Sequence, residues 1–405
     1  MSIYDRYGVK PLINAAGTKT RLGGGSMAPD VLQAMNEAST RSVDMAALQA
    51  AASRVIERVT GAEAGYVTSG AAAALTLSAA ACLTGTDPAK IDRLPHTDGM
   101  PNEIVLFRLH RNSYDHAWRA AGAHLVDVGV DDRMARSGVR SIEPWELEAA
   151  INERTIAVAY VAGAAASPPL DDFVRVAHAH DLPVLVDAAG ELPPKENLRA
   201  FIAAGADLVA FSGGKAIGGP QATGVLCGRK DLIQAVLLNH LDMDMDLSLW
   251  DPPEDLLPRH LLDALPRHGI GRGFKVGKEE IIGLLVALER FAEGAWEDTL
   301  DIRREFANGV AQELDGVEGV DARVIETAGY PRVAIHFAQE GGAQRAYRRL
   351  LNGDPGIALD PSDVHSGVLT LNTATIATAD EPLVAAAVLD ACRRTTAATV
   401  SKEES

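Results

Sequence analysis

The segment Asp207-Leu-Val-Ala-Phe-Ser-Gly-Gly-Lys-Ala-Ile-Gly-Gly-Pro-Gln-Ala-Thr-Gly224 contains the most informative residue of this chain, Lys215. An apolar run that predicts a buried strand leads into a glycine-rich turn, and this turn carries the lysine. A lysine at the end of a buried strand costs stability, because a desolvated ammonium is unfavourable. The same desolvation favours the neutral amine, which is the form that makes a Schiff base with a carbonyl compound.

A second predicted strand, 183–187, ends on an acid, Asp187. The carboxyl ends of neighbouring parallel strands meet at one edge of a sheet, so Asp187 and Lys215 are expected to lie close together. Pyridoxal phosphate (PLP) requires such a pair, a lysine for its aldehyde and an acid for its pyridinium nitrogen. The two residues therefore predict a PLP site in which both are catalytic and both bind the cofactor.

The composition indicates a large protein with an acidic surface. The chain has 405 residues, of which 47% are hydrophobic, and this is enough for a full core and two domains. A net charge of −17 argues against nucleic acid or an anionic membrane as a partner. The three cysteines, Cys82, Cys227 and Cys392, are far apart and predict neither disulfides nor a zinc motif. With no signal segment or long apolar run, we expect a cytoplasmic protein.

Short β-rich runs alternate with helical patterns between residues 62 and 230. This alternation predicts an α/β fold with an open, seven-stranded, mainly parallel sheet. The expected strands are 64–68, 103–109, 124–128, 155–161, 183–187, 207–211 and 223–227, and the expected helices are 71–83, 144–152, 170–180, 196–204 and 230–238.

Residues 240–268 do not continue this alternation of strands and helices. They contain the acidic sequences Asp242-Met-Asp-Met-Asp246 and Trp250-Asp-Pro-Pro-Glu254. We interpret them as an inserted loop. Alternating aspartates suit a metal ion, but a solvated acidic loop is the commoner outcome, so no metal is predicted. A helix over 278–291 then leads to a small α+β domain with strands 320–325, 332–337 and 368–371 and helices 343–351 and 382–394. The predicted division is an N-terminal segment lining the site (1–30), a large PLP-binding domain (31–277) and a small C-terminal domain (278–405).

The turn Thr68-Ser-Gly-Ala-Ala72 ends one predicted strand and opens a helix. Backbone N–H groups and hydroxyls of Thr68, Ser69 and Gly70 can hold a phosphate at such a helix N-terminus. The alternative is an ordinary helix N-cap by the Ser69 side chain.

His110 follows the predicted strand 103–109. Its flat ring could stack on the pyridine ring of the cofactor, and its imidazole could move protons. Tyr114 and His116 are competing candidates for this position, and a solvated loop histidine remains the alternative.

Cations cluster in Gly271-Arg-Gly-Phe-Lys-Val-Gly-Lys278. Arg272 and Lys275 are candidates for binding a substrate carboxylate or phosphate, since arginine pairs bidentately with such anions. The alternative is a surface role at the start of a helix, which the helix dipole slightly disfavours. Arg21, in the glycine-rich stretch 14–25, is a weaker anion-binding candidate.

Five segments give the chain a family resemblance. They are Asn14-Ala-Ala-Gly-Thr18, the Thr68-Ser-Gly turn, Val186-Asp-Ala-Ala-Gly-Glu-Leu-Pro-Pro194, Phe211-Ser-Gly-Gly-Lys-Ala-Ile-Gly-Gly-Pro-Gln221 and Gly271-Arg-Gly-Phe-Lys-Val-Gly-Lys-Glu-Glu280. Over nearly its whole length the chain resembles the fold-type I PLP enzymes of the bacterial selenocysteine synthase (L-seryl-tRNA(Sec) selenium transferase) family. Within that family, the branch it resembles most contains the D-glucosaminate-6-phosphate ammonia-lyase-like proteins.

The resemblance implies Lys215 as the Schiff-base lysine, Asp187 as the pyridinium partner, and Ser69, Gly70 and Ser212 near the phosphate. It also implies a homodimer or higher homo-oligomer with sites at the subunit interface. The tRNA-charging members carry an extra N-terminal domain and a basic surface. In this acidic chain the Asn-Ala-Ala-Gly motif begins at residue 14, so a tRNA substrate is not expected.

The predicted function is a PLP-dependent lyase acting on an amino acid or a phosphorylated amino sugar acid. Lys215 would remove the α-proton, and β-elimination would give a 2-oxo acid and ammonia. A racemase or an aldolase-type lyase would use the same motifs. A non-catalytic PLP-binding regulator is a further alternative, which the absence of a visible basic patch disfavours.

Overall fold

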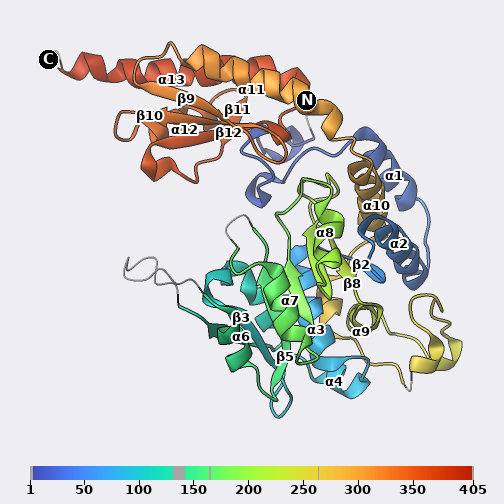
Figure 1. Cartoon of the computed structure of the whole chain (residues 1–405). Helices are drawn as coiled ribbons and strands as arrows, with labels where there is room; N and C mark the ends of the chain where they lie inside the picture. Colours follow the sequence, from blue (N-terminus) through green and yellow to red (C-terminus); the bar gives the residue numbers. More distant parts are fainter. Residues whose placement is uncertain (1–2, 131–141, 164–165, 263, 404–405) are drawn as a thin grey trace. The chain divides into compact units, whose positions relative to one another are not determined.

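The computed structural model describes residues 3–130, 142–163, 166–262 and 264–403, which divide into two units (Figure 1). The large unit is Met27–Glu293, and the small unit combines Met1–Ser26 with Gly294–Ser405.

The large unit is built on the predicted seven-stranded sheet. The strand order is β2-β8-β7-β6-β5-β3-β4. All neighbouring pairs are parallel except those made by β8, which runs antiparallel to both β2 and β7. The sheet therefore has one reversed strand, and the mainly parallel α/β prediction is confirmed. The strands are β2 (Ala64–Thr68), β3 (Glu103–Phe107), β4 (His124–Val128), β5 (Thr155–Val161), β6 (Val184–Asp187), β7 (Leu208–Ser212) and β8 (Gly224–Gly228).

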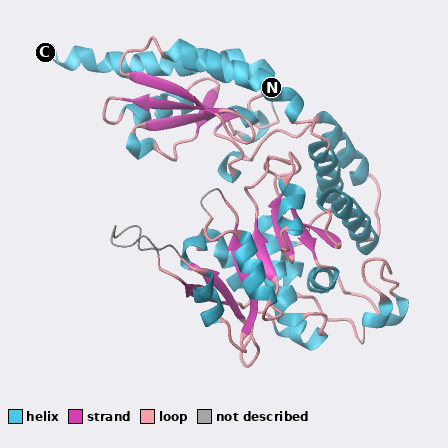
Figure 2. Ribbon diagram, in the orientation of Figure 1, coloured by secondary structure: helices cyan, strands magenta, loops and turns pink. Residues whose placement is uncertain are grey.

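Helices pack around these strands (Figure 2). The alanine-rich helix α3 is almost wholly buried, because it packs against β2 and β5 to β8 as well as against α5 and α9. Its small side chains suit this close packing. The helices are α1 (Pro29–Ser39), α2 (Met45–Thr60), α3 (Ala71–Thr84), α4 (Pro88–Arg93), α5 (His116–Ala120), α6 (Pro144–Ala150), α7 (Leu170–His178), α8 (Asn197–Ala203), α9 (Lys230–His240) and α10 (Lys278–Ala292). None of these or of the other described helices has the length and apolar character to cross a membrane.

The acidic segment after α9 is only partly the solvated loop that was expected. Asp242, Asp244 and Asp246 are exposed, but the apolar side chains between and after them are buried in the core of the large unit, namely Met243, Trp250, Leu256 and Leu257. Side chains therefore alternate between core and solvent in Asp242–Met243–Asp244, and the apolar residues anchor the segment. Among its described residues, regular structure is limited to the short 3-10 turns η6 (Leu247–Leu249) and η7 (Arg259–Leu261).

The small unit is an α+β structure with two sheets. Strands β9 (Val320–Ile325), β10 (Arg332–Phe337) and β12 (Val368–Asn372) form an antiparallel sheet in the order β12-β10-β9. Strand β1 (Leu12–Ala15) pairs in parallel with β11 (Gly356–Leu359). This pairing joins the N-terminal segment to the C-terminal part of the small unit. Helices α11 (Leu300–Leu314), α12 (Gly342–Leu351) and α13 (Glu381–Glu403) complete the unit.

The division into units differs from the predicted boundaries at residues 30 and 277. The N-terminal segment belongs to the small unit, because β1 needs β11 as its hydrogen-bonding partner. Helix α10 belongs to the large unit, because it packs on α1 and α2. Gly283 permits this packing, since a Cβ at that position would lie 2.7 Å from Cγ of Met35 in α1.

Candidate active site

Strand register brings the predicted phosphate turn and Ser212 to one edge of the sheet. Thr68 of β2 pairs with Gly224 of β8, and Gly224 also pairs with Ser212 of β7. Because β8 is reversed, its first residue lies between the last residues of the two strands beside it. The 68–70 turn therefore lies on the same edge as the lysine turn that follows Ser212.

Asp187 and Lys215 come together at this edge as predicted. Asp187 ends β6 beside β7, is 8% exposed, and accepts a hydrogen bond from the Ala189 N–H at 3.1 Å. The half-buried Lys215 follows β7, and a Cβ on Gly190 would lie 3.9 Å from its Nζ. Burial raises the pKa of Asp187, and the Ala189 N–H and the charge of Lys215 only partly oppose this. A buried carboxyl of this kind gains from a cation placed against it, and a protonated pyridine nitrogen is such a cation.

Glu191 is a further acid that the sequence analysis did not single out. It is half-buried, and its pKa is raised by burial and by the nearby charge of Asp187, while Lys215 opposes the shift. The signal was its position in the same loop, four residues after Asp187. Glu191 is therefore a further acid close enough to Asp187 and Lys215 to feel their charges.

The Thr68–Gly70 turn leaves the start of α3 open to an anion. The N-cap of α3 is Gly70, at φ 140°, and no described side chain caps the first turn. The Ser69 hydroxyl instead donates to the Phe274 carbonyl at 2.8 Å, and that of Thr68 donates to the Gly70 carbonyl at 2.9 Å. The alternative of an ordinary N-cap by Ser69 is therefore wrong. The first N–H groups of α3 are available to a phosphate.

His110 is buried, and so it is not the solvated loop histidine that was the alternative. The ring is 4% exposed and packs among Phe107, Tyr160 and Phe173. Nδ1 accepts from the Val161 N–H at 3.0 Å, so Nε2 carries the proton and faces the Ser167 carbonyl at 3.3 Å. Burial lowers the pKa of His110, and both nitrogens are occupied, which does not favour proton transfer. Stacking on the cofactor stays a prediction; the competing Tyr114 and His116 are both exposed.

Arg272 is held in a 3-10 turn, η8 (Ile270–Phe274), and Lys275, which follows it, is exposed. The guanidinium Nη2 donates to Asp242 Oδ2 at 2.9 Å. Its Nε is buried and has no hydrogen-bond partner among the described residues. The turn lies next to the phosphate-binding candidate, since Ser69 bonds to the Phe274 carbonyl. Arg21 lies in the small unit, exposed in the 3-10 turn η2 (Thr20–Leu22).

Asp242, Asp244 and His268 form an exposed group whose ligand atoms lie within 4.8 Å of one another. Asp242 pairs with Arg272 at 2.9 Å, and Asp244 lies 3.6 Å from His268. Because such exposed acidic groups are common without a metal and Asp242 already pairs with Arg272, we assign no metal to this group.

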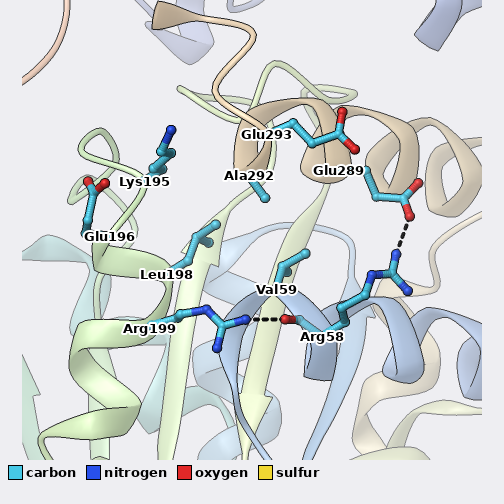
Figure 3. A pocket seen from close by; sticks show the side chains of 9 residues that line it. All are labelled: Arg58, Val59, Lys195, Glu196, Leu198, Arg199, Glu289, Ala292 and Glu293. Atoms are coloured by element: carbon cyan, nitrogen blue, oxygen red, sulfur yellow. Dashed lines mark hydrogen bonds and ion pairs between the residues drawn. The ribbon is translucent and has the colours of Figure 1, made fainter.

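A cavity of about 380 Å³ opens elsewhere in the large unit, among residues of α2, α8 and α10 (Figure 3). Arg58 pairs with Glu289, and Arg199 donates to the Arg58 backbone oxygen. Lys215 and Asp187 do not line this cavity. The predicted site residues at the sheet edge are therefore not part of this cavity.

The sheet, the acid that ends β6 and the lysine after β7 together define the architecture of the fold-type I PLP enzymes. The family model described as L-seryl-tRNA selenium transferase matches residues 107–246. D-Glucosaminate-6-phosphate ammonia lyase from Salmonella typhimurium is 33% identical to this chain, over 95% of this chain and 96% of the relative. The chain belongs to this selenocysteine synthase-like family of PLP enzymes, as the sequence motifs predicted.

Two further similarities bear on the fold and the reaction. A solved structure of D-glucosaminate-6-phosphate ammonia-lyase superimposes with a TM-score of 0.78 at 31% identity, covering 98% of this chain and 99% of that one. A 5'-C-glycyluridine monooxygenase-decarboxylase from Streptomyces is also 33% identical, over 88% of this chain and 78% of the relative. Relatives with the same level of identity thus have names that describe different reactions, so the reaction must be argued from the site.

Proposed function

We propose that this protein is a PLP-dependent lyase that releases ammonia from a phosphorylated amino sugar acid of the D-glucosaminate-6-phosphate type. The observation that carries this proposal is the meeting of Lys215 and buried Asp187 in a chain with an ammonia lyase as a relative over almost its full length. The sequence-based alternatives, a racemase and an aldolase-type lyase, would use the same two residues.

The residues at the sheet edge fit PLP. The uncapped start of α3 suits a phosphate, the buried carboxyl of Asp187 suits a protonated ring nitrogen, and half-buried Lys215 suits an aldehyde. Ser212 lies in register with the phosphate turn and is a further phosphate candidate. When bound, PLP supplies an electron sink for the charge left on the α-carbon.

The proton steps fall to the residues of the chain. Lys215 Nζ would accept the α-proton of the substrate, and Asp187 would hold the ring nitrogen of PLP in its protonated form. The hydroxyl on the β-carbon leaves as water after taking a proton from Lys215 or from Glu191. The product enamine then adds water and releases ammonia, which leaves a 2-oxo acid. Atoms balance, because one water leaves and one is taken up.

An assay for ammonia and 2-oxo acid with D-glucosaminate-6-phosphate and a panel of amino acids tests this proposal. Ammonia formed in equal amount with a 2-oxo acid is expected. Inversion of the α-carbon without ammonia would instead identify a racemase, and release of an aldehyde would identify an aldolase-type lyase. No change in any substrate despite bound PLP would favour the non-catalytic regulator.

We also propose a cytoplasmic homodimer or higher homo-oligomer. The exposed apolar side chains of Ile3, Tyr4, Tyr7 and Val9 in the small unit support this, because a subunit contact would remove them from water. Sedimentation analysis that found only monomer at micromolar concentration would contradict it.

Gly224→Ala is expected to weaken PLP binding. A Cβ at this position would lie 2.6 Å from the Gly70 carbonyl carbon and 2.8 Å from the Ala71 nitrogen, so the phosphate turn must move. A hydrogen bond to a charged phosphate is worth about 1.5–3 kcal/mol, so losing one weakens binding about tenfold or more. Titration of the apoenzyme with PLP, followed by visible absorbance, measures this. Gly309→Ala in α11 is the control, since its Cβ meets nothing within 4 Å. Unchanged affinity in the folded Gly224 variant would refute the phosphate assignment.

Arg272→Ala is expected to raise KM by about 10- to 100-fold while the absorbance of bound PLP stays unchanged, because a charge-assisted pair with the substrate anion is lost. Arg272→Lys should also weaken binding, since it keeps the charge but loses the bidentate fork. The pair with Asp242 is no obstacle, because a solvent-exposed ion pair contributes only about 0–1 kcal/mol. Arg290→Ala, which breaks a surface pair with Asp30, is the control. A substrate-analogue complex with Arg272 turned to solvent would contradict this role.

A further inference from the structure

The turn η8, which carries Arg272, packs against the C-terminal end of helix α9. A Cβ on Gly269 would lie 2.5 Å from the Asn239 carbonyl oxygen, and one on Gly271 would lie 2.8 Å from the same atom. Two glycines therefore allow the backbone of η8 to contact α9 directly. The last residue of α9, His240, lies at this contact and is 4% exposed.

The ring of His240 makes two hydrogen bonds that fix its tautomer. Nε2 faces the Phe274 carbonyl at 3.3 Å, and a carbonyl can only accept, so Nε2 carries the proton. Nδ1 is then the acceptor, and the buried Tyr66 hydroxyl donates to it at 2.9 Å. Burial, opposed in part by the Phe274 carbonyl and helped by the charge of Arg272, lowers the pKa of His240 to about 4. The ring is therefore neutral and works as a donor and an acceptor at once.

The Phe274 carbonyl receives two donors from two different elements. One is His240 Nε2 at the end of α9, and the other is the Ser69 hydroxyl in the phosphate turn, at 2.8 Å. A carbonyl oxygen has two lone pairs, so both bonds can exist together. The only proton of the Ser69 hydroxyl is used in this contact, which leaves the backbone N–H groups of α3 and the Ser212 hydroxyl as candidate phosphate donors. The carbonyl thus ties the Arg272 turn to the cofactor end of the sheet.

We propose that His240 is a positioning residue, which with Tyr66 fixes the Phe274 carbonyl against Ser69 and so holds Arg272 at the phosphate turn for an anionic substrate. The inference rests on the proposed function, in which Arg272 binds that anion. His240 does not itself touch the reacting atoms. His240 instead affects the position of the Arg272 guanidinium relative to the first turn of α3.

Binding of inorganic phosphate to the PLP-loaded enzyme, measured by calorimetry, tests the inference without turnover. His240→Phe keeps the ring volume but removes both hydrogen bonds. It is expected to weaken phosphate binding about tenfold, the effect of misplacing one charge-assisted contact. His240→Gln restores an N–H toward Phe274 and is expected to bind within about threefold of wild type, since a neutral hydrogen bond is regained. Tyr66→Phe, which removes one hydroxyl, is expected to fall between the two.

The control is His178→Phe, because His178 bonds to Asp207 Oδ2 at 2.8 Å at the opposite edge of the sheet. It is expected to leave phosphate binding unchanged. If His240→Phe binds phosphate with wild-type affinity while Arg272→Ala binds it more weakly, the positioning role of His240 is overturned, but the role of Arg272 is not. If His240→Phe does not fold, equal affinities for Tyr66→Phe and wild type would overturn it instead. Normal phosphate binding without ammonia release would count against the proposed lyase activity but leave the role of His240 intact.

Discussion

Lys215→Ala is expected to lose ammonia release by at least about 10²–10⁴-fold, the usual contribution of a positioned acid–base group. The turn that holds Lys215 has no other lysine, and in the proposed mechanism the amine both holds the cofactor aldehyde and accepts the α-proton. The wild-type protein should be yellow with bound PLP, and borohydride should abolish that absorbance and fix the label to the peptide with Lys215. The variant should show neither effect.

Lys195→Ala is the matched control, because Lys195 lies in the same unit but lines the separate cavity. It should keep the absorbance, the borohydride label and the activity. A label found by mass spectrometry on any lysine other than Lys215 would show that the lysine has been assigned wrongly.

Asp187→Asn is expected to bind PLP but to lose turnover by about 10²–10³-fold, because an unprotonated pyridine stabilises the charge on the α-carbon poorly. The apoenzyme should respond in the opposite direction. Burial raises the pKa of Asp187 in the folded state, so stability is lost as pH rises from the unfolded pKa through the folded one. At neutral pH the neutral amide removes that cost, and the Tm of the apo variant should equal or exceed that of wild type.

The combination of lower kcat and undiminished Tm separates a functional acid from a structural one. Asp207→Asn is the contrasting variant, since Asp207 is equally buried but bonds to His178 at 2.8 Å and to the Val184 N–H at 2.8 Å. It should lower Tm and keep normal kinetics. Near-normal turnover in a folded Asp187→Asn variant would show that Asp187 is structural.

The ends of the strands were easier to predict from the sequence than the side-chain contacts around them. Apolar runs marked the ends of β6 and β7, and the meeting of Asp187 and Lys215 followed from the rule that parallel strands end at one edge. Periodicity carries no information on strand direction, so the reversal of β8 could not be predicted. That reversal places Gly224 against the backbone of the Thr68–Gly70 turn.

Long-range side-chain contacts were also outside the reach of the sequence. The Ser69 hydroxyl was equally suited to capping α3, and only the folded chain shows that the Phe274 carbonyl, 205 residues away, receives it. The pairing of Arg272 with Asp242 likewise depends on how the acidic segment is anchored by buried residues such as Trp250. Local pattern does not specify such partners.

The parallel pairing of β1 with β11 has a consequence for how the chain is made. Its partners lie near residues 12 and 356, so β1 must wait for its partner until the large unit and much of the small unit have been synthesised after it. The large unit is continuous in sequence and can fold during translation, as domains generally do. The small unit is therefore completed last. A nascent chain stalled after residue 293 would contain all strands of the seven-stranded sheet, but β1 would still lack β11 as its hydrogen-bonding partner.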